Sequence, residues 1–71
     1  MKRNFIVQIS NMYLNEFIFY WVYYEQPCAL LLLKPKEEGL TGIKLTIESP
    51  EAETFLNRAK EKIGFILHEV N

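Results

Sequence analysis

The chain has 71 residues, of which 49% are hydrophobic and 24% are charged, and eight basic against nine acidic residues leave a formal net charge of −1. Such a composition argues against intrinsic disorder, and a chain of this size has room for one domain, residues 1–71. The balanced charge disfavours a nucleic-acid binder, because those proteins carry a basic excess that neutralises phosphates.

Cysteine usage and hydrophobic run length indicate the cellular location. The single cysteine, Cys28, cannot form an internal disulfide, so a reducing cytoplasmic environment is expected. The basic start of the chain leads into an apolar stretch that polar residues soon interrupt, unlike a signal peptide. The aromatic run at residues 17–24 is far shorter than the roughly 20 residues of a membrane span. We therefore expect no membrane association.

The first predicted strand covers residues 4–10, and residues 11–26, which follow it, have two interpretations. Their aromatic and β-branched side chains favour a strand by propensity. Their apolar side chains also follow helical spacing, and a cap at Ser10 or Asn11 and a length of about 16 residues favour a helical crossover. The inward stripe of this helix would consist of Leu14, Phe17, Ile18, Trp21 and Val22.

Two further strands are predicted in the middle of the chain. Residues 28–33 form a short apolar run between Pro27 and Pro35, which suits a buried strand. Apolar and polar residues alternate strictly over residues 43–48, as in a strand with one buried face. A polar loop, residues 34–42, joins the two strands, which we expect to form a hairpin.

The clearest helix signal follows the alternating strand. Ser49 supplies an N-cap hydroxyl, Pro50 occupies the first turn without loss of a hydrogen bond, and Glu51 is favoured by the helix dipole. Gly64 is placed to cap the C-terminus of this helix, and residues 65–70 form a closing strand. The buried face of the helix is predicted to consist of Ala52, Phe55, Leu56, Ala59 and Ile63.

These elements give an α+β fold of order β-α-β-β-α-β, the ferredoxin-like plan, with a four-stranded antiparallel sheet covered on one face by two helices. A strand at residues 11–26 would instead give a five-stranded antiparallel sheet with one helix. The first layout, over essentially the whole chain, resembles the ACT-like branch of ferredoxin-like domains. That resemblance implies a homodimer that binds an amino acid or another small ligand between subunits. The first strand–helix turn, Ile9 to Met12, departs from the glycine that such ligand-binding domains commonly have there.

The sequence predicts no catalytic residues, no metal site and no cofactor. His68 is the only histidine, and on a strand it points to the opposite face from Glu69, so the two cannot act as a dyad. A metal cluster or a nucleophilic triad needs more groups of this kind than one histidine and one cysteine. We therefore expect a protein that is not an enzyme.

The aromatic residues support the functional prediction. A helix at residues 11–26 exposes a surface rich in tyrosine, which is typical of interfaces, although the rings could instead simply enlarge the core. We expect a non-enzymatic binding or regulatory module that acts as a homodimer and holds a small ligand or a protein partner. The predicted site residues are Ser10, Asn11, Phe19, Tyr20, Tyr23 and Tyr24.

The alternative function uses the strand interpretation of residues 11–26. A strand would place Phe17, Phe19, Trp21 and Tyr23 along one face, where aromatic rings could stack on the bases of single-stranded nucleic acid. The near-neutral charge disfavours this module, because such grooves are basic.

Overall fold

A computed structural model describes residues 2–35 and 37–70, and Met1, Lys36 and Asn71 lie outside the described residues. Residues 11–26 contain a helix, so the predicted order β-α-β-β-α-β is confirmed and the five-stranded alternative is wrong. The elements are β1 (Arg3–Ser10), the 3₁₀ turn η1 (Asn11–Tyr13), α1 (Leu14–Tyr23), β2 (Ala29–Leu32), β3 (Leu40–Ile47), α2 (Pro50–Ile63) and β4 (Ile66–Val70).

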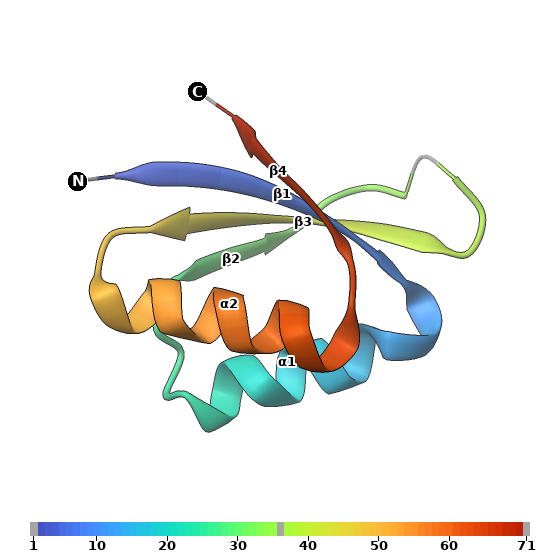
Figure 1. Cartoon of the computed structure of the whole chain (residues 1–71). Helices are drawn as coiled ribbons and strands as arrows, with labels where there is room; N and C mark the ends of the chain where they lie inside the picture. Colours follow the sequence, from blue (N-terminus) through green and yellow to red (C-terminus); the bar gives the residue numbers. More distant parts are fainter. Residues whose placement is uncertain (1, 36, 71) are drawn as a thin grey trace.

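The described strands form an antiparallel sheet of order β2-β3-β1-β4, and both helices lie on the same face of it (Figure 1). The two central strands pair along their full length, from Arg3 opposite Ile47 to Ser10 opposite Leu40. The predicted hairpin between β2 and β3 is present. This strand order, with one helix in each crossover, is the ferredoxin-like arrangement.

The core lies between the sheet and the helices. Alternation along β1 and β3 directs Val7 and Ile43, which are opposite each other, toward the helices, and both are fully buried. Phe17 from α1 fills the middle of the core. Its ring centroid lies 5.6 Å from that of Phe55 on α2 and 5.4 Å from that of Phe65, both in edge-to-face geometry.

The ends of α2 follow the sequence prediction. The Ser49 hydroxyl accepts a hydrogen bond of 3.1 Å from the Ala52 backbone N–H. Gly64 ends the helix with a φ of 78°, a left-handed value that glycine adopts without steric cost. Local sequence signals therefore define this helix completely.

The structure corrects the predicted faces of α1 at two positions. Tyr20, expected to face outward, packs against the core, whereas Val22, expected to face inward, is 51% exposed. The reason is that α1 contacts α2 as well as the sheet, which turns its buried face toward α2. Tyr24 illustrates this, because its ring centroid lies 6.0 Å from that of Phe55.

Two strand predictions are also corrected. β3 begins at Leu40 rather than at residue 43, because β1 pairs with it as far as Ser10 and thereby extends it into the predicted loop. The run at residues 28–33 is an edge strand and not a buried one, because β2 pairs with β3 alone among the described strands. Leu31 in this strand is 59% exposed.

Candidate functional site

An exposed apolar surface lies on the outer side of α1. Phe19 is 68% exposed and Tyr23 is 70% exposed, as the helical interpretation predicted, and Val22 lies beside them. Their spacing of three and four residues places them on one face of the helix. We call Phe19, Val22 and Tyr23 the α1 patch.

Aromatic residues that pack against the core hold the Tyr23 side chain of the α1 patch in place. The Tyr23 ring packs edge-on against Tyr24, with centroids 5.4 Å apart, and Tyr24 packs in turn against Phe55 of α2. Tyr20 and Tyr24 are both partly buried against the core. Tyr20 and Tyr24, two of the predicted site residues, therefore hold the α1 patch in place and contribute little exposed surface to it.

Ser10 and Asn11 build the turn between β1 and α1. The Ser10 hydroxyl accepts a hydrogen bond of 3.3 Å from the Met12 N–H, as the predicted cap requires. The Asn11 side-chain oxygen accepts one from the Thr41 hydroxyl, and the Asn11 N–H donates to the Gly39 carbonyl at 2.9 Å. At a helical rise of 1.5 Å per residue, Asn11 and Tyr23 lie about 18 Å apart along the helix axis. The structure thus does not gather the predicted residues into one groove.

The face of the sheet opposite the helices carries a pocket of about 230 Å³, lined by residues that include Ile6, Gln8, Leu33 and Lys34. Pockets for drug-sized ligands are larger, roughly 300–1,000 Å³. A second hollow on the same face lies between Ile6, Gln8, Ile66 and His68. The second hollow, of about 360 Å³, lies within that range, so this face carries one hollow of ligand size.

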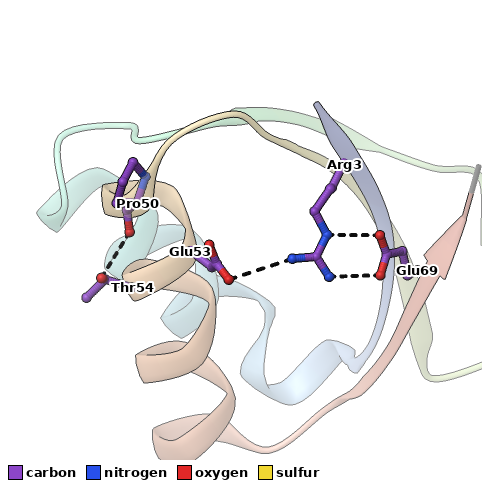
Figure 2. A network of polar contacts seen from close by, with 5 residues as sticks. All are labelled: Arg3, Pro50, Glu53, Thr54 and Glu69. Carbon is purple, nitrogen blue, oxygen red and sulfur yellow. Dashed lines mark hydrogen bonds and ion pairs between the residues drawn. The ribbon is translucent and has the colours of Figure 1, made fainter. Parts of the chain in front are cut away.

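An ion cluster that sequence reasoning missed connects β1, β4 and α2 (Figure 2). The Arg3 guanidinium donates two hydrogen bonds of 2.9 Å to the Glu69 carboxylate and lies 3.6 Å from that of Glu53. It also sits 5.0 Å from the centre of the Phe5 ring. Its hydrogen bonds hold the pKa of Glu69 below the usual range. Each Glu69 oxygen thus accepts one hydrogen bond from Arg3, which ties β1 to β4.

The other polar groups do not converge. His68 is opposite Ile6 and Glu69 is opposite Phe5, so the two side chains leave different faces of the sheet, as predicted. Among residues 2–35 and 37–70, no three histidine, cysteine or acidic side chains gather in a way that could hold a metal ion. Within the same residues, no helix is long and apolar enough to cross a membrane.

The helical structure removes the predicted stacking surface for nucleic acid. Phe17 is fully buried. The Trp21 ring is partly buried, and its Nε1–H donates a hydrogen bond of 2.9 Å to the Cys28 carbonyl. The four aromatic residues predicted to stack on bases therefore do not share one exposed face, because they lie on a helix and not on a strand.

Cys28 is expected to be a poorly reactive thiol. Burial raises the pKa of Cys28 from its ordinary value of 9.0 to about 11. The thiolate is the nucleophile, so a rise of this size lowers the reactive fraction near neutral pH roughly 100-fold. Iodoacetamide should therefore alkylate the native protein far more slowly than the urea-unfolded protein at the same pH. Equal rates in the two states would show that the thiol is not shielded.

Comparisons with known proteins agree with the architecture. No protein-family model and no curated protein matches the chain. Among solved structures, the de novo designed protein Ferredog-Diesel is similar, with a TM-score of 0.54 over 100% of this chain and 85% of that chain. The chain has a ferredoxin-like fold. Sequence identity with the designed protein is 12%, so the similarity concerns the fold alone.

Proposed function

We propose that this protein is a non-enzymatic binding module that acts as a homodimer, with the α1 patch forming part of its contact surface. The observation that carries the proposal is the exposure of Phe19 and Tyr23, at 68% and 70%, on a helix anchored in the core. Aromatic residues are enriched where proteins meet, and exposed apolar surface of this kind is typical of interaction sites.

The total surface supports self-association. The chain exposes 5128 Å². A monomeric protein of its mass, 8.4 kDa, is expected to expose about 4,600 Å². A standard protein–protein interface buries about 800 Å² on each partner, which would more than cover this excess.

Two side chains that could carry chemistry are paired or shielded, which is compatible with a binding role. Glu69 is paired with Arg3, and burial raises the pKa of Cys28 to about 11, which suppresses its thiolate. An ACT-like regulatory role in a reducing cytoplasm belongs to the same proposal.

The double substitution Phe19→Glu and Tyr23→Glu tests the proposal. Both side chains are exposed, so the fold should persist, whereas two charges placed in an apolar interface should weaken the dimer at least tenfold. Size-exclusion chromatography and circular dichroism would measure the two effects. Tyr20→Glu is unsuitable, because Tyr20 packs against the core.

The matched control adds the same charge elsewhere. Thr54 and Asn57 are exposed on α2, so Thr54→Glu with Asn57→Glu should leave the oligomeric state unchanged. A dimer that survives the α1 substitutions, or a wild-type protein that is always monomeric, would contradict the proposal.

A further inference from the structure

The edge strand β2 has an unusual composition for an edge. Ala29–Leu32 carries no charged side chain, and Leu31 and Leu32 are 59% and 52% exposed. Proteins usually protect sheet edges with very short strands, charged residues, prolines or covering segments, and within the strand itself β2 has only its length of four residues. The other edge, β4, contains the charged Glu69. Only β2 therefore presents an uncharged strand to solvent among the described edges.

Hydrogen-bond alternation identifies the free backbone groups of β2. The Leu33 N–H donates a hydrogen bond of 2.8 Å to the Gly42 carbonyl. Leu31, two residues before Leu33, is opposite Lys44, two residues after Gly42. Because alternate residues of an antiparallel strand bond to the same neighbour, Leu31 directs its N–H and C=O toward β3. Leu30 and Leu32 consequently direct theirs away from the sheet, at the open edge.

We infer that a second copy of this chain docks on β2, so that the two β2 strands pair antiparallel about a two-fold axis beside Leu31. This inference rests on the proposed homodimer and specifies its geometry. In this register the Leu30 backbone bonds to the partner's Leu32, and the Leu32 backbone bonds to the partner's Leu30. The four free groups of each copy are thereby satisfied, and the two sheets become one continuous sheet.

Self-complementarity favours a second copy over an unrelated strand. The free groups belong to two residues placed symmetrically about Leu31, so the strand matches its own two-fold image without a shift in register. Every paired side chain is leucine, and no like charges meet across the axis. A two-fold interface uses the same surface on both subunits, which is the property this strand has.

Helix α1 borders the same edge and adds apolar area to it. The hydrogen bond from the Trp21 indole to the Cys28 carbonyl joins this side of α1 to the start of β2. Val22 follows Trp21 on the helix, lies on the side of α1 that faces away from α2, and is 51% exposed. Leu32 points toward the helix layer, because it is opposite the buried Ile43. Pairing through β2 would cover apolar surface at this edge, and it places the helix layers of the two copies on the same face of the joined sheet.

Leu32→Pro tests the backbone pairing directly. Proline removes the N–H that faces the partner and no N–H that bonds to β3, and edge strands tolerate it. The variant should be monomeric with an unchanged circular dichroism spectrum. Leu32→Ala is the control, because it shortens the side chain but keeps the N–H, and it should still dimerise.

Amide hydrogen exchange of the wild-type dimer gives a second test that does not depend on a variant folding. The Leu30 and Leu32 amides should exchange at least tenfold more slowly in the dimer than in the diluted monomer. Rapid exchange of both amides in the dimer would overturn the β2 interface. A dimer that Leu32→Pro leaves intact but the Phe19 and Tyr23 substitutions dissociate would overturn it too, while leaving the proposed function standing.

Discussion

Phe17→Ala is expected to lower the free energy of unfolding by about 3–5 kcal/mol, a large fraction of the stability of so small a chain. The Phe17 side chain is fully buried and packs edge-on against Phe55 and Phe65. Removing a buried phenylalanine costs about 3–5 kcal/mol through lost apolar burial and the cavity left behind. A chain of this length has a free energy of unfolding of only about 4–10 kcal/mol. Urea titration followed by far-ultraviolet circular dichroism would measure the loss.

Phe19→Ala is the matched control for this prediction. Phe19 lies two residues farther along the same helix and is 68% exposed, so the monomer should lose no more than about 0.5 kcal/mol. Both variants should be compared at low protein concentration, because dimerisation adds to apparent stability. Equal losses at the two positions would mean that α1 does not bury the face described here.

Ile43→Asn is expected to have a comparable effect on the central strand. Ile43 is fully buried opposite Val7, which is also fully buried, so an amide placed there loses apolar burial and finds no prearranged partner. The lost burial costs about 2–5 kcal/mol, and the unsatisfied amide adds about 1–3 kcal/mol. Thermal unfolding should show a midpoint lower than that of the wild-type protein by about 10 °C or more.

The same substitution one residue later provides the contrast. Lys44→Asn changes an exposed side chain on the opposite face of β3, and its effect should stay within about 0.5 kcal/mol. Adjacent residues of a strand point to opposite faces, so the pair measures the register of β3. A large loss of stability in Lys44→Asn with a small loss in Ile43→Asn would contradict the described fold, because β3 would then bury the face that carries Lys44.

The elements with strong local signals could be predicted from the sequence. The alternation from Ile43 to Ile47 gave the buried face of β3, and the Ser49 cap and Gly64 gave both ends of α2. Each signal depends on neighbouring residues alone. Residues 11–26 carried conflicting signals, and the helix prevailed because a crossover between β1 and β2 needs its length.

The features that depend on tertiary packing could not be predicted in this way. The apolar run of β2 looks like a buried strand, but the strand order places it at an edge. The orientations of Tyr20 and Val22 depend on where α2 lies beside α1. The bond between Arg3 and Glu69 joins residues 66 positions apart, which no local pattern indicates.

Sedimentation equilibrium of the wild-type protein over a range of concentrations tests the homodimer most directly. The proposed contacts at the α1 patch and along β2 predict a mass that rises with concentration to twice the 8.4 kDa of the chain and then stays constant. A mass of 8.4 kDa at every concentration up to the solubility limit would contradict the proposed function and the β2 interface together.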